Sequence, residues 1–191
     1  MIFVLLGPSG AGKTTLLKHS GLPELISHTT RNPRQNEVDG VDYYFVSREE
    51  FKTLDLLERT EYAGNFYGLA RQEADRYLHA IIATDRNGAE QLRRICSVIV
   101  IYVQIRPFTM IKRMINRGES WGNVVKRAKN AVVADEFSNQ GFADFVVNND
   151  GDLQSAIEQL HAIIDSLIYN QWHGFSLERQ IINKAGTTPA F

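Results

Sequence analysis

The sequence has few of the residues that mark disulfide-rich or metal-binding proteins. It contains one cysteine among 191 residues, and its five histidines are scattered along the chain. Neither a disulfide framework nor a zinc site is therefore expected. Cys96 adjoins the apolar run at 98–103, where a lone cysteine is most simply a small buried hydrophobe in a reduced compartment.

Long hydrophobic runs are missing as well, and neither sign of charge dominates. The formal net charge is −1, which argues against a protein that works by coating nucleic acid or an anionic membrane. The N-terminal apolar run at 2–6 is too short for a signal peptide or a membrane span. We therefore expect a cytoplasmic protein, monomeric or homodimeric, with neither nucleic acid nor membrane as its partner.

The chain does contain enough apolar residues for a sizeable core. Hydrophobic residues make up 43% of a length that suits one domain with small mobile lobes. Strands are expected at 2–6, 43–46, 80–85, 97–103 and 143–147, and helices at 14–20, 71–79, 87–94, 107–117, 124–138 and 153–167, with a short one after the Ser-x-x-Glu capping box at 47–50. The alternation predicts an α/β fold with a mainly parallel sheet flanked by helices. From His173 onward the helical pattern fades, and 184–191 is expected to be a frayed tail.

The most informative segment is the glycine-rich stretch at 7–14, Gly-Pro-Ser-Gly-Ala-Gly-Lys-Thr. It lies between an apolar strand and a helix, the context in which this spacing forms a phosphate-binding loop for a nucleoside triphosphate. Lys13 would reach the β- and γ-phosphates, and the Thr14 hydroxyl would ligate Mg²⁺. The ATP-binding residues expected here are Gly7, Pro8, Ser9, Gly10, Ala11, Gly12, Lys13, Thr14 and Thr15. The loop alone does not name the reaction, because kinases, ATPases and GTPases share it.

Asp85 is a candidate second ligand for Mg²⁺. It follows the apolar run at 80–83, and in phosphate-loop proteins an acid at the end of a neighbouring strand commonly helps to hold the metal. The same residue could instead cap the helix expected at 87–94. The residues by themselves leave both interpretations open.

Two basic segments are candidates for further phosphate contacts. Arg31 and Arg34 lie three residues apart around Pro33, so that two planar forks could meet one phosphate. Six cations fall between 112 and 129, and Gly118 between them could act as a hinge that closes them over phosphates. Either segment could equally be solvated surface, because arginine and lysine are mostly exposed in any protein.

Several motifs give the chain a close resemblance to the guanylate kinase family. They are Ser-His-Thr-Thr-Arg-Asn-Pro-Arg at 27–34, Glu-Val-Asp-Gly-Val-Asp-Tyr-Tyr-Phe-Val-Ser at 37–47, Gly-Asn-Phe-Tyr-Gly at 64–68, Arg-Gly at 117–118, Lys-Arg at 126–127 and Val-Val-Asn-Asn-Asp at 146–150. The match covers about residues 1–170. It implies a single domain at 1–172, with a core at about 1–26 and 80–172, a monophosphate-binding lobe at about 27–80 and a lid at about 117–135. The segment at 173–191 would be an extension of unknown role.

The resemblance implies a site that holds ATP, Mg²⁺ and GMP together. The phosphate of GMP would be held by Arg31, Arg34, Tyr43 and Tyr67, while Ser27 and Glu61 would meet the guanine edge. A carboxylate suits guanine, which offers adjacent N1–H and 2-amino donors. Arg113, Arg117 and Arg127 would surround the transferring phosphoryl group with Lys13, and Asn148 would lie near the adenine of ATP. Catalysis would then be in-line positioning plus charge stabilisation.

The chain also departs from the family pattern. Leu69 stands where the family usually has Ser or Thr, and Ala83 where it usually has a strand carboxylate. The stretch between Glu61 and Gly64 is about three residues shorter than usual, and the lid is abbreviated around 121–122.

These departures leave two alternatives to an ATP:GMP phosphotransferase. One is a related kinase that acts on a different nucleotide or on a phosphosugar such as ribose bisphosphate. The other is a catalytically weak, guanylate-kinase-like module that binds protein ligands. The intact loop argues against the module, because a protein without nucleotide chemistry has no need for Lys13 and Thr14.

Overall fold

The computed structural model describes residues 1–34, 37–62, 64–133 and 136–185, with side chains to 169. Its main sheet has the strand order β6-β1-β7-β8, and every neighbouring pair is parallel. The strands are β1 (Ile2–Leu6), β6 (Ala80–Ala83), β7 (Val98–Gln104) and β8 (Phe145–Asn148). All four carboxyl ends therefore lie along one edge, where ligands bind in open α/β sheets. The predicted α/β class is confirmed.

Helices cover both faces of this sheet, which explains why its strands are apolar on both sides. Alternate residues of β1 point to opposite faces, so Phe3 and Leu5 pack toward α1 (Lys13–Lys18) and α7 (Leu153–Ala185), while Val4 and Leu6 pack toward α4 (Arg86–Arg93). Each of these four β1 side chains is buried. The two-sided core fixes the strand that leads into the glycine-rich loop.

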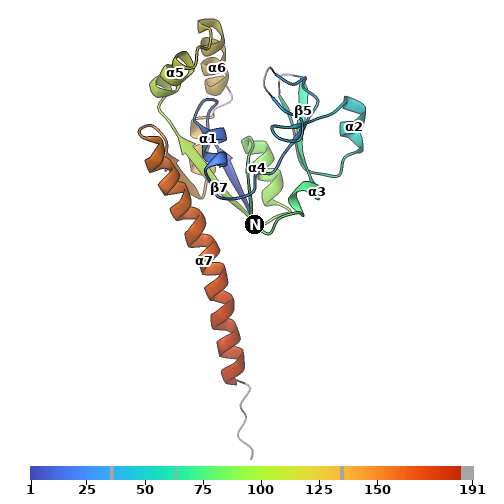
Figure 1. Ribbon diagram of the computed structural model, residues 1–191, viewed down its shortest axis with the longest axis vertical. Helices are drawn as coiled ribbons and strands as arrows, with labels where there is room; N and C mark the ends of the chain where they lie inside the picture. Colours follow the sequence, from blue (N-terminus) through green and yellow to red (C-terminus); the bar gives the residue numbers. More distant parts are fainter. Residues whose placement is uncertain (35–36, 63, 134–135, 186–191) are drawn as a thin grey trace, which may run out of the picture.

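A second, mixed sheet forms a small lobe beside the main one (Figure 1). Its strand order is β3-β2-β5-β4, made of β2 (His28–Thr29), β3 (Tyr44–Phe45), β4 (Leu56–Tyr62) and β5 (Asn65–Ala70), with the helices α2 (Arg48–Thr53) and α3 (Arg71–Ala74) attached. The capping box is present, because Ser47 and Glu50 each accept from the other's backbone N–H.

The small lobe is also where the sequence-based elements were wrong. Tyr62 pairs with Asn65 and Glu61 with Phe66, so β4 and β5 form an antiparallel pair, and neither strand was among those expected. The sequence pattern did not predict β4, because its buried positions are Leu57, Glu58 and Thr60, which show no apolar alternation. The helix expected at 71–79 ends at Ala74, since the chain must turn into β6.

Two further helices lie above the glycine-rich loop in the view of Figure 1. They are α5 (Pro107–Asn116), which Pro107 starts, and α6 (Trp121–Val133). Gly118, with φ of 78°, ends α5 through a hydrogen bond from its N–H to Ile115 O. The helix expected at 124–138 begins earlier, at Trp121, and Ser138 belongs to a separate 3₁₀ helix, η1 (Ser138–Phe142).

The last helix, α7, confirms the helix predicted at 153–167 and continues well beyond it. Ala156, Ile157, Leu160 and Ile164 are buried against the main sheet. The helix then extends away from the sheets to Ala185 (Figure 1). Most of the expected frayed tail, 186–191, lies outside the described residues. Within the described part of the chain, no helix combines the length and apolarity needed to cross a bilayer.

Candidate functional site

The glycine-rich loop adopts a backbone conformation that only glycine permits at low cost. Gly7, Gly10 and Gly12 have φ of 146°, 91° and 94°, in the region that a Cβ disfavours. A Cβ on Gly7 would also lie 2.6 Å from Val103 O. Lys13 folds back over the loop, and its Nζ donates to Gly7 O at 2.5 Å and to Pro8 O at 3.2 Å. The loop is therefore closed into a ring before any phosphate arrives.

Burial lowers the pKa of Lys13 to about 8, while the charge of Glu136 raises it and that of Arg127 lowers it. Glu136 also accepts from the N–H of Ser9 at 2.9 Å. Its own backbone is anchored, because the Tyr102 hydroxyl donates to Glu136 O at 3.2 Å. A carboxylate of the protein thus occupies a loop N–H that could otherwise face an anion.

The residue that braces the loop is Asn149 rather than Asn148. Asn149 is buried, and its Nδ2 donates to Ala11 O at 2.6 Å. A Cβ on Gly12 would come within 2.4 Å of the same nitrogen. Asn148, expected near the adenine, is exposed at the end of β8, where its Oδ1 accepts from the N–H of Asp150. The sequence motif contains both asparagines, and only packing distinguishes them.

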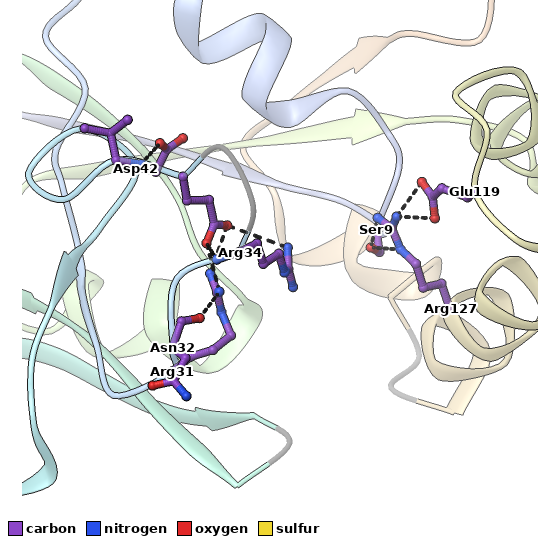
Figure 2. A network of polar contacts seen from close by, with 9 residues as sticks. Ser9, Arg31, Asn32, Arg34, Asp42, Glu119 and Arg127 are labelled. Carbon is purple, nitrogen blue, oxygen red and sulfur yellow. Dashed lines mark hydrogen bonds and ion pairs between the residues drawn. The ribbon is translucent and has the colours of Figure 1, made fainter.

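The predicted catalytic arginines converge on the loop from α5 and α6. Arg127 donates from Nε and Nη2 to Ser9 Oγ at 3.1 and 2.7 Å. Its Nη1 donates to both carboxylate oxygens of Glu119 at 2.7 Å (Figure 2). Arg117 lies 3.4 Å from Glu119. Arg113 Nη1 would lie 3.9 Å from a Cβ on Gly12, so Arg113 and Arg127 lie at the loop, and Arg117 is linked to Arg127 through Glu119.

A second anion-binding cluster lies on the small lobe, on the other side of the view in Figure 2. Arg31 Nη1 and Nη2 donate to the two carboxylate oxygens of Glu37 at 2.9 and 3.0 Å. The backbone N–H of Arg34 donates to Glu37 as well, at 2.7 Å. Arg31 stacks over the ring of Tyr43, 5.5 Å from its centroid, and Tyr43 meets Tyr67 edge to face. Four of the six predicted GMP-binding residues therefore cluster around one carboxylate.

The two clusters face one another across a contact between lid and lobe. Asn130 on α6 donates from Nδ2 to the Tyr62 hydroxyl at the tip of the β4–β5 hairpin, at 3.1 Å. Ser27, another predicted GMP-binding residue, is half-buried just before β2, and its carbonyl accepts from Tyr44 N–H.

On β4, the buried carboxyl group belongs to Glu58 and not to Glu61. Glu61 is exposed and pairs with Phe66 across the hairpin, whereas Tyr67 pairs with Thr60. Because side chains alternate along a strand, Glu61 points to the face opposite Tyr67. Glu58 is 3% exposed, and its Oε2 has no hydrogen-bond partner among the described residues.

The electrostatics of Glu58 are those of a functional group. Burial raises its pKa to about 8, and the nearby charge of Asp85 raises it further, while the Leu69 N–H donates to the carboxyl group and lowers it. A buried acid with a shifted pKa and a free oxygen is a candidate ligand contact. The sequence did contain a signal for Glu58. The stretch that ends at Gly64 is about three residues shorter than the family pattern when it is counted from Glu61, but it has the length of that pattern when it is counted from Glu58.

Asp85 serves as the helix cap that the sequence offered as one of its two interpretations. Its side chain accepts from the Gly88 N–H at 2.8 Å at the start of α4. Within 1–34, 37–62, 64–133 and 136–185, no group of three His, Cys, Asp or Glu side chains is arranged to hold a metal ion. Thr14 is exposed at the first turn of α1. A metal held there would take most of its ligands from bound phosphates and water, as Mg²⁺ usually does.

A phosphate-binding loop at the end of a parallel strand, facing a second anion cluster on a separate small sheet, defines a P-loop kinase for a phosphorylated acceptor. Comparisons with known proteins agree. The sequence model described as guanylate kinase matches residues 1–167. The chain is 36% identical over 179 residues to a guanylate kinase of Pseudomonas fluorescens, covering 85% of each chain, and 34% identical over 182 residues to one of Thiobacillus denitrificans, covering 87% of this chain and 86% of the other.

A solved structure leads to the same result. The crystal structure of guanylate kinase from Anaplasma phagocytophilum superposes with a TM-score of 0.68 at 28% identity, covering 87% of this chain and 85% of that one. The chain belongs to the guanylate kinase family. The resemblance found in the motifs is thereby confirmed.

Proposed function

We propose that this protein transfers the γ-phosphoryl group of ATP to GMP or dGMP, giving ADP and GDP or dGDP, and that Glu58 reads the base. The observation that carries the assignment of the base site is the buried Glu58 carboxyl, whose Oε2 lacks a partner in the part of the chain that the structure describes. Such a group costs free energy unless a ligand satisfies it. Guanine would do so with its N1–H and 2-amino donors when it binds the ionised form of the carboxyl group.

The neighbours of Glu58 support this role. The side chain of Leu69 has no hydroxyl and is fully buried in the apolar core. Its backbone N–H, however, donates to the Glu58 carboxyl group. Asp85 lies close enough to act on the pKa of Glu58, and its Oδ1 is committed to the cap of α4. We therefore place Asp85 at the base site rather than at the metal. The alternative acceptors suggested by Leu69 and Ala83 are not favoured.

The acceptor phosphate would displace Glu37 from the arginines of the small lobe. Glu37 occupies the bidentate fork of Arg31 and the N–H of Arg34, which is the geometry in which arginine recognises phosphate. Tyr43 and Tyr67 pack beside this fork, and we propose that they bind the same phosphate. Ser27 remains a proposed contact to the base.

The donor phosphates would lie in the loop at 7–15. Lys13 would turn from Gly7 O and Pro8 O toward the β- and γ-phosphates, and Arg113, Arg117 and Arg127 would stabilise the charge that develops on the transferring group. Thr14 is the protein's proposed ligand for Mg²⁺, which when bound would neutralise charge on the phosphates. The protein performs no covalent step of its own. Its contribution is to hold acceptor oxygen, phosphorus and leaving oxygen in line.

A coupled ADP-release assay tests the assignment. The wild type should show a kcat/KM for GMP and dGMP that exceeds the value for AMP by several orders of magnitude, because a mismatched base leaves buried polar groups unpaired. IMP, which lacks the 2-amino group, should fall in between. Glu58→Gln should collapse the preference for GMP, whereas the matched variant Glu61→Gln should keep it. A wild type that treats GMP and AMP alike would refute the acceptor, and a Glu58→Gln variant with the full preference would refute the base reader.

A further inference from the structure

The guanidinium of Arg127 divides its donors between two partners. The edge formed by Nε and Nη2 faces the phosphate-binding loop, where both nitrogens donate to Ser9 Oγ at 3.1 and 2.7 Å. The remaining nitrogen, Nη1, donates to both oxygens of Glu119 at 2.7 Å (Figure 2). The edge that can grip an oxyanion with two parallel bonds is therefore the edge turned toward the loop.

Glu119 is held in a fixed place relative to this arginine. Its backbone N–H donates to Met114 O at 3.2 Å, directly after Gly118 has ended α5. Glu119 lies in the connection between α5 and α6, and Arg127 lies on α6, so the pair ties this connection to the helix that carries the arginine. The side chain of Glu119 is 22% exposed and that of Arg127 37% exposed, so the pair is partly shielded from solvent and weakened less by screening than a surface pair.

The charge of Glu119 also opposes the repulsion among the cations of the site. The positive charge of Arg127 acts on Lys13 strongly enough to lower its pKa, and Arg117 lies within 3.4 Å of Glu119 as well. Without Glu119, Arg127 would lose its carboxylate partner beside the like charges of Lys13 and Arg117, and it could relieve the repulsion by turning toward solvent. A long side chain that is free to turn loses conformational entropy when a ligand orders it.

We propose that Glu119 is a positioning residue for phosphoryl transfer, because it holds Arg127 with its Nε and Nη2 edge aimed at the loop, where phosphate oxygens replace Ser9 Oγ as acceptors. Glu119 touches neither substrate. It acts through Arg127, and the inference rests on the proposed role of Arg127 at the transferring group. Pre-orientation of this kind raises the rate because the arginine pays little ordering cost at the moment of reaction.

A double-mutant cycle tests the proposal, with kcat and both KM values measured for Glu119→Gln, Arg127→Ala and the double variant. Glu119→Gln is nearly isosteric and keeps an acceptor oxygen, but it removes the charge. We expect it to lower kcat by about tenfold, since a charge-assisted hydrogen bond is roughly twice as strong as a neutral one. Arg127→Ala should cost more. The double variant should match Arg127→Ala within about twofold, because a residue that acts through Arg127 has nothing left to position.

Controls separate positioning from a structural role. Glu90→Gln breaks an Arg–Glu pair of similar length on α4, between Glu90 and Arg86 at 2.8 Å, and should leave kcat unchanged. Thermal unfolding should place Glu119→Gln and Glu90→Gln within a few degrees of the wild type. An unchanged kcat in Glu119→Gln, or effects that multiply in the double variant, would overturn the proposal. If the wild type does not phosphorylate GMP, the proposed function fails, and the same cycle scored on the Kd for ATP still decides the role of Glu119.

Discussion

The Oε2 atom of Glu58 lies so close to the Cα of Gly88 that a Cβ on this glycine would come within 2.8 Å of it. The same Cβ would lie 2.3 Å from Thr84 Oγ1. Gly88 also donates its N–H to Asp85 at the start of α4. The glycine thus lets α4 approach the small lobe closely enough to bury the Glu58 carboxyl group, which we propose as the base reader. It is also hydrogen-bonded to Asp85, the second acid that we propose for that site.

Gly88→Ala should therefore damage acceptor binding more than ATP binding. The new methyl group overlaps Thr84 and Glu58, so either α4 or the carboxyl group must shift, and overpacking of this kind costs about 1–3 kcal/mol. We expect the KM for GMP to rise by about tenfold or more, with little change in the KM for ATP. Gly141→Ala is the control, because no described atom lies within 4 Å of a Cβ there. Equal effects on both KM values would contradict the placement of Glu58.

The raised pKa of Glu58 predicts a loss of stability as the pH rises. Burial and Asp85 raise this pKa from 4.5 to about 8, so between these values the folded protein binds a proton that the unfolded chain has released. The stabilisation is complete below about pH 4.5 and is lost as the pH passes through 8. The free energy of unfolding should fall by on the order of a few kcal/mol across this window.

Urea denaturation at several pH values between 5 and 8 measures this dependence, and Glu58→Gln supplies the comparison. The glutamine stays neutral, so its curve should be flatter than that of the wild type. Lys13 does not interfere in this range. Its pKa is lowered from 10.5 to about 8, so it increases stability only as the pH rises from about 8 to 10.5. Parallel curves for wild type and Glu58→Gln would show that Glu58 is ionised throughout.

Lys13→Ala should nearly abolish phosphoryl transfer while the fold remains. Lys13 is the loop's own cation at the proposed position of the β- and γ-phosphates, and loss of such a group typically costs two to three orders of magnitude, ~10²–10³, in kcat. Stability should not fall much, because burial already disfavours the charged amine. Lys18→Ala, at the exposed end of α1, is the control. Ordinary turnover by folded Lys13→Ala protein would remove the loop from the catalytic site.

Arg31→Lys should separate the acceptor site from the ATP site. Lysine keeps the charge but lacks the planar fork that Glu37 now occupies. The KM for GMP should rise by about tenfold or more, with a much smaller change in the KM for ATP. Arg59→Lys is a matched control, since Arg59 stacks on Phe66 and Phe51 on the other face of the same sheet. A larger effect of Arg31→Lys on ATP would refute this division.

Much of the fold and the phosphate chemistry could be predicted from local sequence. The glycines, Lys13 and Thr14 have a fixed spacing because one loop must wrap one phosphate chain, and the parallel strands are apolar on both faces because helices cover them. Arg31 and Arg34 are neighbours in sequence and share one acceptor in space. Each of these features leaves a local pattern in the chain, in spacing or in apolarity, so the sequence alone was enough to predict it.

The tertiary structure decided which acid of β4 is buried and therefore which one we propose for the base site. Glu58 and Glu61 are three positions apart on β4, and an odd separation on a strand places two side chains on opposite faces. No local property says which face is buried, since both carry charged residues; packing of β4 against α4 makes that choice. The same holds for Asn149 over Asn148 at the loop, and for Glu119, which meets Arg127 only because the turn at Gly118 brings α5 and α6 together.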